Sequence, residues 1–454
     1  MNRKASRLVV LASIVIALVL AAAGCSPAAS FRPATPPHAA AFGAEAYHQW
    51  MMTCVDAMEN DVPQITRSAE AAAKLHVQEG YPILAMGDNG FISEASGRAG
   101  GMITLIGMYD SRRRRRRKIP PNAIVLYCLG DGSGQKDFDR INDLGQSGKM
   151  VIVFGRGALL AKARKVGLPA AAMVDTHAAA HGGLFKNSEG RWVVPTDPIA
   201  DLVALWTWTG EFVAACTRLG KMPVMYQAYG TPGGKQWARD LKDKTFHDQT
   251  PAKVPRGKLA REFLQKTRKC LTTIREKEAA NIRKAARWAM ASRRGGHDLY
   301  VFLFGHSIQN RMGHPHNPGY FTQINGRGIR PRRDVTLAPG DFLMYVGYAQ
   351  LPDWGEFKRW NYLPTWRQAG VKLIWSFGQL IGPTFQKARS QVREDELFID
   401  QHWPPILDER RPPGGCTASI PGYPIKILPA SGVAGEAVLW MVNAELFALL
   451  ERAD

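Results

Sequence analysis

The chain has 454 residues, of which 45% are hydrophobic and 22% are charged, and its formal net charge at pH 7 is +20. This length and composition suffice for two globular domains with full cores, and they exclude a disordered or fibrous chain. The basic balance favours anionic ligands, anionic lipid headgroups or nucleic acid as partners.

Residues 1–24 have the pattern of an export signal. Three basic residues precede an apolar run over 8–23, which small residues close just before Cys25. A cysteine at this point resembles the bacterial lipobox, in which the thiol is acylated and the signal is cut before it. The resemblance predicts an exported lipoprotein of the cell envelope, anchored to the membrane through Cys25 and a tether at 25–45. A plain signal peptide or an uncleaved anchor is the alternative.

The segment 46–230 alternates helical and strand patterns. Apolar residues at helical spacing predict a long helix over 44–78, and a short strand that ends at Gly87 follows it. A glycine turn, a short helix and two further strands at 124–129 and 148–155 come next, with a helix between those two strands. This rhythm is typical of right-handed βαβ units and a parallel sheet with helices on both faces.

A run of seven cations at 112–118 holds much of the positive charge and lies between two predicted strands. We expect a solvated loop there, with lipid headgroup contact as the alternative. Nucleic acid ranks last because no aromatic residue interleaves the run, so no nucleic-acid partner is expected.

Five cysteines follow Cys25 and form no Cys-x-x-Cys pair, so neither a zinc site nor a thioredoxin-like motif is indicated. Five is an odd number, so at least one thiol is unpaired within a monomer. Cys128 and Cys216 lie in apolar segments, where we expect buried core residues.

The segment 231–258 is rich in Gly, Pro, Lys and Asp and reads as a linker, with helical content around 236–242. A helix is predicted over 261–288. The run 298–305 then reads as a strand buried on both faces, ending at Gly305.

The two halves of the chain repeat each other in order. Gly305 lies 218 residues after Gly87, and 340–345 follows 122–127 at the same offset. Three further matches keep the order at offsets of 216 to 234: Cys54 with Cys270, 174–177 with 399–402, and 205–211 with 439–445. We therefore predict one domain copied twice, at 46–230 and 259–454.

Three loops resemble those of the sugar isomerase (SIS) domain family. The stretch 129–153 begins with a Gly-Asp-Gly-Ser-Gly run and looks like the phosphosugar loop of that family. The glycine turns after Gly87 and at 305–307 are similar to its first loop. The resemblance covers both copies. Two such domains in tandem are similar in arrangement to the isomerase half of glucosamine-6-phosphate synthase. It implies an α/β fold of two tandem three-layer αβα sandwiches, with mainly parallel sheets of flavodoxin-like topology.

A phosphosugar or other anionic ligand needs converging N–H and hydroxyl donors near a helix N-terminus. The glycine loops offer such donors. The residues expected to bind the ligand are Gly87, Asn89, Gly90, Ser93, Gly132, Ser133, Gly134 and Ser307.

Aldose–ketose isomerisation also needs a base beside the carbonyl and a group that opens the ring. Glu94 resembles the glutamate that some isomerases of the family place just after the first loop, and His306 could open the ring. Each has a plain structural alternative: Glu94 as a favourable charge in the first turn of its helix, and His306 as a cap or a donor to a carbonyl. Glu211 and Glu445 recur in the repeat and could be structural partners of the sheet.

The Asp-x-His pattern at 175–177 recurs at 400–402, where it could contact a ligand or serve the fold. His314 and His316 offer two imidazoles to a metal, but no carboxylate or cysteine is patterned with them. We therefore predict no metal site and no cofactor.

The second copy lacks the Gly/Ser loop, because 347–352 reads GYAQLP, and it has no glutamate after 305–307. We expect one working pocket, built mainly by the first copy and closed by the second. Two functions remain open: an isomerase of a phosphosugar or amino sugar with Glu94 as base, or a non-catalytic, lipid-anchored sensor or binding module for a sugar derivative. A homodimer is a further possibility.

Overall fold

The computed structural model describes residues 43–109, 118–228, 233–325, 332, 334–348, 363–378, 382–404 and 415–451. The predicted export signal, Cys25 and most of the cationic run, at 112–117, lie outside these residues. Their predicted roles stay predictions.

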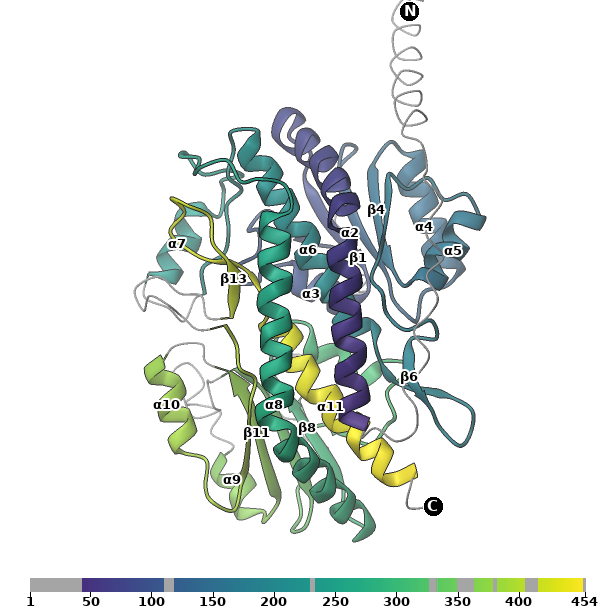
Figure 1. The fold of residues 1–454 in the computed structure, drawn as a ribbon, viewed down its shortest axis with the longest axis vertical. Coiled ribbons are helices and arrows are strands. Elements are labelled where there is room, and N and C mark those ends of the chain that lie inside the picture. Colours follow the sequence, from purple (N-terminus) through teal and green to yellow (C-terminus); the bar gives the residue numbers. More distant parts are fainter. Residues whose placement is uncertain are drawn as a thin grey trace, which may run out of the picture. The chain divides into compact units, whose positions relative to one another are not determined.

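Each half of the chain forms a parallel sheet of five strands (Figure 1). The first sheet contains β1 (Ile83–Gly87), β2 (Ile106–Gly107), β3 (Ile124–Leu129), β4 (Met150–Gly155) and β5 (Ala172–Asp175). The second contains β8 (Leu299–Leu303), β9 (Thr322–Gln323), β10 (Phe342–Tyr348), β11 (Lys372–Gly378) and β12 (Leu397–Asp400). The spatial orders β2-β1-β3-β4-β5 and β9-β8-β10-β11-β12 are the same, and they match the flavodoxin-like order. The predicted fold class is confirmed.

Helices cover both faces of each sheet, and the sheets share a helical layer between them. The helices are α2 (Gly43–Glu79), α3 (Asn89–Ala95), α4 (Gln135–Gln146), α5 (Gly157–Lys165), α6 (Asp197–Arg218), α7 (Gly234–Leu241), α8 (Lys258–Arg294), α9 (Leu363–Gln368), α10 (Gly382–Ser390), α11 (Ser431–Glu451) and the 3₁₀ helix η1 (Ile308–Gly313). One core joins α2, α6, α8 and α11 to the inner faces of both sheets. Side chains of α4 and α5 pack on the outer face of the first sheet, and those of α9 and α10 on that of the second.

Two short antiparallel hairpins complete the described elements: β6 (Gly183–Lys186) with β7 (Trp192–Pro195), and β13 (Cys416–Ala418) with β14 (Ile427–Pro429). Helix α7 confirms the helical content predicted in the linker. Because one core runs through both halves, the domain boundaries at 230 and 259 remain predictions from the sequence.

The apolar composition of the strands and of two helices follows from their burial. All six residues of β3 and all five of β8 are buried, as expected for strands covered on both faces. Helices α6 and α11 are long and apolar enough to cross a membrane, but they are mostly buried in this core. A helix that is apolar on all sides is typical of such a position. The five described cysteines are also buried and free, which confirms the prediction for Cys128 and Cys216.

The repeat extends to matched side-chain contacts. The Cys54 thiol donates to the Thr176 carbonyl at 3.4 Å, and the Cys270 thiol donates to the Gln401 carbonyl at 3.4 Å. In each half, a cysteine of the long first helix thus contacts the carboxyl end of the last strand of the sheet. Two copies of one contact at matched positions are direct support for an internal duplication.

The recurring Asp-x-His patterns fix the sheets to the long helices. His177 has a φ of 58°, its N–H donates to Asp175 Oδ1, and its Nε2 lies 2.9 Å from Asp61 Oδ2 on α2. His402 has a φ of 46° and makes the equivalent contacts, with Nε2 2.9 Å from Glu278 Oε1 on α8. The structure therefore favours the structural interpretation of this pattern over a ligand contact.

Glu211 and Glu445 join the two halves. Glu445 Oε2 accepts a hydrogen bond from Ala44 N–H at the start of α2, at 3.0 Å. Glu211 Oε2 accepts one from Gly257 N–H at the start of α8, at 2.9 Å. Each half's last helix thus binds the N-terminus of the other half's first helix. These glutamates are structural partners of helices rather than of the sheet.

One detail of the sequence alignment between the copies was wrong. Matching Gly87 to Gly305 places Ile83 at Val301, yet Ile83 pairs with Ile124 whereas Val301 pairs with Met344. The equivalent pair in the second half is Leu299 with Phe342, so the match of Ile124 to Phe342 holds and the match of Gly87 to Gly305 is displaced by two residues. A shift of two keeps every side chain on the same face of the sheet, so the hydrophobic pattern alone could not detect it.

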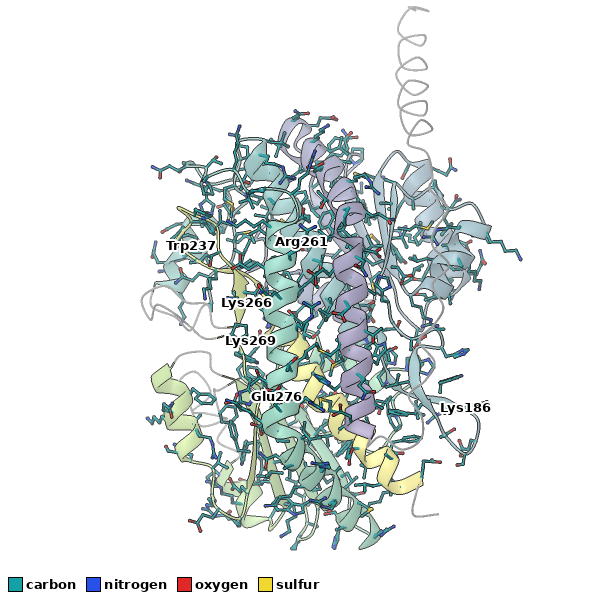
Figure 2. All side chains as sticks on the ribbon, viewed as in Figure 1. Lys186, Trp237, Arg261, Lys266, Lys269 and Glu276 are labelled. Atoms are coloured by element: carbon teal, nitrogen blue, oxygen red, sulfur yellow. The ribbon has the colours of Figure 1, made fainter. Side chains whose placement is uncertain are left out.

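The exposed side of α8 carries much of the described positive charge. Arg261, Lys266 and Lys269 lie along it (Figure 2). The neighbouring α2 supplies carboxylates, and Arg268 pairs with Asp56 at 2.6 Å. Because such pairs are exposed, they contribute little to stability, and the surface stays basic.

Candidate ligand site between the two halves

The loops that follow the first strand of each sheet meet at the boundary between the halves. The Ser93 hydroxyl donates to the His306 carbonyl at 2.6 Å. Asp88 N–H donates to the Cys128 carbonyl at the end of β3, which places the first loop beside the second strand. The predicted segments at 87–94 and 305–307 are therefore brought together.

A buried arginine of the second half, Arg311, fills the space beside the first loop. Its Nε donates to Glu436 Oε1 at 2.7 Å, and its Nη1 lies 3.4 Å from Asp88 Oδ1. A Cβ built at Gly90 would come within 3.0 Å of the guanidinium, so the loop passes against it closely. Gly87, with a φ of +91°, forms the turn, and the exposed Asn89 starts the short helix α3.

The Gly132-Ser133-Gly134 loop lies at the start of α4, near the surface. Gly132 is exposed and Ser133 is half-buried. Gly134 N–H donates to Asp137 Oδ2 at 3.0 Å, so this donor is already occupied. A Cβ at Gly132 or Gly134 would meet no atom within 4 Å. The loop is accessible, and its predicted role in ligand binding remains a prediction.

Glu94 lies fully inside the protein and holds Arg98. Its Oε1 is 3.2 Å from Arg98 Nε and accepts a hydrogen bond from Trp206 Nε1 at 3.3 Å. Burial raises the pKa of Glu94, although Arg98 lowers it. Arg98 is itself buried and donates to the Tyr348 hydroxyl and to Ser431 Oγ, both in the second half.

A small pocket opens at the carboxyl ends of β8 and β10. Its volume is about 20 Å³, enough for one water molecule. The polar groups of its wall belong to Arg98, His306, Ser307, Tyr348, Gln401 and Ser431. Phe304 and Trp403 supply aromatic surface. The wall comes mainly from the second half, and Arg98 comes from the first. The sequence instead predicts a pocket built mainly by the first copy and closed by the second.

His306 is held in its neutral form. Burial, followed by repulsion from Arg98, lowers the pKa of His306 to about 3. The imidazole is therefore uncharged near pH 7 and can act in the pocket as a neutral hydrogen-bonding group. Ser307, at 1% exposure, lies beside it in the wall.

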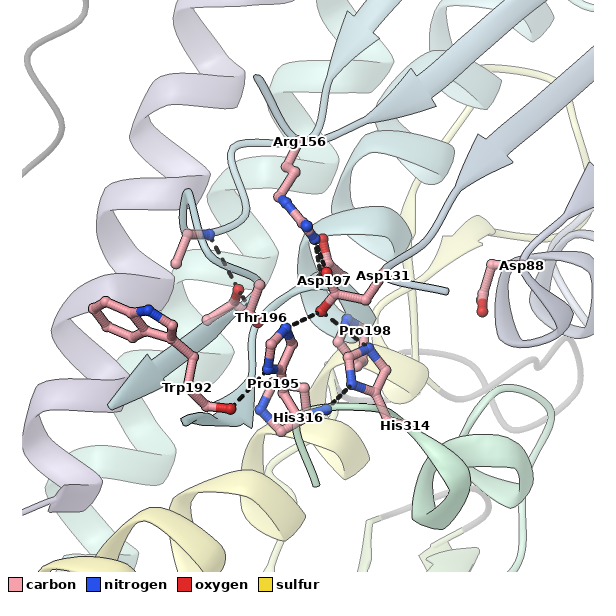
Figure 3. Close-up of polar contacts among 12 residues, drawn as sticks. Asp88, Asp131, Arg156, Trp192, Pro195, Thr196, Asp197, Pro198, His314 and His316 are labelled. Carbon is pink, nitrogen blue, oxygen red and sulfur yellow. Dashed lines mark hydrogen bonds and ion pairs between the residues drawn. The ribbon is translucent and has the colours of Figure 1, made fainter. Parts of the chain in front are cut away.

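The matching position of the first half holds a network of charged side chains (Figure 3). Arg156 Nη1 donates to Asp131 and lies 3.2 Å from Asp197 Oδ2. His316 Nε2, from the second half, lies 2.7 Å from Asp131 Oδ2. Burial opposes ionisation of Asp131, yet His316 and Arg156 hold the pKa of Asp131 at about 2. Burial and the nearby Asp131 raise the pKa of Asp197 well above its usual range.

The two clefts exchange side chains between the halves. Arg98 lies eleven residues after Gly87, and His316 lies eleven residues after Gly305. Arg98 reaches the second-half pocket, whereas His316 reaches the first-half network. Neither the role of Arg98 nor the carboxylates that face His314 and His316 were predicted from the sequence.

The comparisons with known proteins yield similar folds. No family model matches the chain, and no curated protein matches it. One similar solved structure is tagatose-6-phosphate ketose/aldose isomerase from Escherichia coli, at 11% identity over 93% of this chain and 96% of that chain, with a TM-score of 0.43. Another is the C-terminal domain of glucosamine-fructose-6-phosphate aminotransferase from Francisella tularensis, at 8% identity over 89% and 96%, with a TM-score of 0.43.

A third similar structure is glucosamine-6-phosphate deaminase from Thermotoga maritima, at 8% identity over 89% of this chain and 94% of that chain, with a TM-score of 0.37. Phosphosugar isomerases, the class that the sequence motifs resemble, are thus among the solved structures similar to this chain. At identities this low, the function has to be inferred from the residues of the site itself.

Proposed function

We propose that the chain binds a sugar derivative with an anionic group in the pocket at the carboxyl ends of β8 and β10. The observation that carries the proposal is the buried Arg98 guanidinium in the wall of this pocket, beside the hydroxyls of Tyr348 and Ser431. Parallel α/β sheets bind ligands at this edge, beside the strand where the order reverses.

The chemistry of the wall suits such a ligand. A guanidinium binds phosphate or carboxylate through directed N–H groups. The hydroxyls and the Gln401 amide can exchange hydrogen bonds with sugar hydroxyls, while Trp403 offers an apolar face. Since the pocket has room for about one water molecule, a bound sugar requires Tyr348 or Trp403, whose ring centroids are 5.6 Å apart, to move.

Binding without turnover fits the position of Glu94 better than isomerisation does. The Glu94 side chain is fully buried, and the wall of the pocket is formed by its partner Arg98. A catalytic base must reach the proton that it removes. In this account Glu94 positions Arg98. Export and anchoring through Cys25 belong to the same proposal, and the sequence pattern alone supports them.

A binding and turnover panel tests this function. The full chain would be titrated calorimetrically with hexose and hexosamine phosphates and with the same sugars lacking phosphate, and each mixture would be assayed for isomerised product. The account expects saturable binding of an anionic sugar and no product. Product formation that Glu94→Gln abolishes would establish the isomerase instead, and the absence of binding by every compound would overturn the proposal.

A further inference from the structure

The charged network of the first half contains an arrangement of ligand atoms that the proposed sugar pocket does not use. Asp131 follows β3, Asp197 begins α6, and His314 follows η1 in the second half. One ligand atom from each of these three residues lies within 4.8 Å of the others. Figure 3 shows His316 beside them, so two carboxylates and two imidazoles gather from both halves.

Asp197 is buried in this network without a full set of partners. The residue is 2% exposed, and no hydrogen-bond donor among the described residues reaches its Oδ1. Its other oxygen lies 3.2 Å from Arg156. Burying an oxygen without a donor costs about 1–3 kcal/mol, so a ligand that satisfied Oδ1 would gain from it.

The hydrogen bonds of His316 orient its Nε2 toward a carboxylate. Its Nδ1 lies 2.7 Å from the Trp192 carbonyl, which can only accept, so Nδ1 carries a proton. In a neutral ring Nε2 would be an acceptor, and in a protonated ring it donates its proton to Asp131 Oδ2, 2.7 Å away. Either a proton or a metal cation has to lie between two such acceptors. A carbonyl that fixes the outer nitrogen is also the usual support of a metal-binding histidine.

Carboxyl groups outnumber cationic side chains around these residues. Asp88, Asp131, Asp197 and Asp201 act on one another electrostatically. The arginines among them are Arg156 and Arg311, and Arg311 also pairs with Glu436. A divalent cation would offset the excess that otherwise has to be neutralised by protons.

We propose that Asp131, Asp197, His314 and His316 bind a divalent transition-metal cation, with zinc as the best match. Two carboxylate oxygens and two imidazole nitrogens suit zinc, cobalt or manganese, whereas magnesium and calcium prefer oxygen ligands alone. Because the ligands come from both halves, the metal would tie the first sheet to the loop after η1.

Binding requires one local change. His314 Nδ1 accepts a hydrogen bond from His316 N–H at 3.2 Å, so the proton of the neutral ring is on Nε2. Coordination through Nε2 moves that proton to Nδ1 and releases the contact. Arg156 can stay hydrogen-bonded to the outer carboxylate oxygens.

Metal titration tests the site with the full chain, stripped with EDTA and dialysed. Calorimetry with ZnCl₂ is expected to show one strong site, and elemental analysis after gel filtration one zinc per chain. Asp197→Asn and His314→Gln are expected to weaken zinc binding at least tenfold. MgCl₂ serves as the comparison, and sugar binding measured in EDTA is expected to be unchanged.

Two controls keep the test decisive. Asp197→Asn keeps the shape of the side chain, and its thermal unfolding in EDTA checks that the variant is folded. His402→Gln removes a histidine that also contacts two carboxylates, Asp400 and Glu278, and should leave zinc binding intact. Absence of stoichiometric zinc, or zinc binding that survives both site substitutions, would overturn the proposal.

Discussion

Glu94 and Arg98 are buried together, with 3.2 Å between Glu94 Oε1 and Arg98 Nε, and the guanidinium continues to Tyr348 and Ser431 in the other half. The carboxylate therefore fixes the orientation of the cation on which the proposed ligand site depends. This pair connects the stability of the boundary between the halves with the chemistry of the pocket.

A double-mutant cycle measures this coupling. Arg98→Met leaves the Glu94 carboxyl buried without its cation, and we expect the free energy of unfolding to fall by about 3 kcal/mol. The Glu94→Gln/Arg98→Met double variant removes both charges and should recover part of that loss. Urea unfolding of the four proteins provides the values. Strictly additive effects would contradict the coupling.

Gly90→Ala tests the close approach of Arg311 to the first loop. The added Cβ would come within 3.0 Å of a guanidinium that Glu436 and Asp88 hold in place. Displacing this cation is expected to cost about 3 kcal/mol of unfolding free energy. Gly132→Ala is the matched control because its Cβ points into open space, and it should change stability little. Equal effects of the two substitutions in thermal unfolding would contradict the packing described.

Glu445→Ala tests the exchange of helix ends between the halves. Without Glu445 the Ala44 N–H loses its acceptor, so the first turn of α2 should open more often. We expect the free energy of unfolding to fall by about 1 kcal/mol and amide hydrogen exchange to become faster in that turn alone. Glu451→Ala on the exposed end of α11 is the control. Unchanged exchange at the start of α2 would argue against the contact.

Acid stability is expected to depend on Glu70. The Arg256 guanidinium, together with Arg218, holds the pKa of Glu70 below its usual range. Because the unfolded chain then binds more protons, the stabilisation from Glu70 is complete above the ordinary glutamate pKa and is lost as the pH falls through the folded value. On acidification from about pH 6 to about pH 3, the free energy of unfolding of Glu70→Gln should therefore fall by about 1 kcal/mol less than that of the unmodified chain. If chemical denaturation shows the same loss of unfolding free energy in both proteins, Glu70 does not have this role.

The fold could be predicted from the sequence because buried strands and helices have recognisable local patterns of apolar residues. Strands β3 and β8 are covered on both faces, so they appear as uninterrupted apolar runs. The long helices α2 and α8 show apolar residues at helical spacing. The two-residue displacement between the copies was invisible because it preserves the face of every side chain.

The sites were harder to predict because their groups come from distant segments. Glu94 was expected to face a ligand, but it is buried and accepts a hydrogen bond from Trp206, which is far away in the chain. His314 and His316 looked isolated because Asp131 and Asp197 approach them only after the two halves pack together. Local patterns identified the loops that meet at this boundary, whereas the partner of each side chain required the three-dimensional arrangement.

The most direct test of the central claim is the affinity of an anionic sugar for the chain and for two tyrosine variants. Tyr348→Phe removes the hydroxyl that contacts Arg98 in the pocket, and Tyr300→Phe removes a hydroxyl that contacts Asp298 at the opposite end of β8. Calorimetric titration with the tightest hexosamine phosphate of the panel should show binding about tenfold weaker for Tyr348→Phe and unchanged for Tyr300→Phe. Equal affinity of all three proteins would contradict the assignment of the ligand to this pocket.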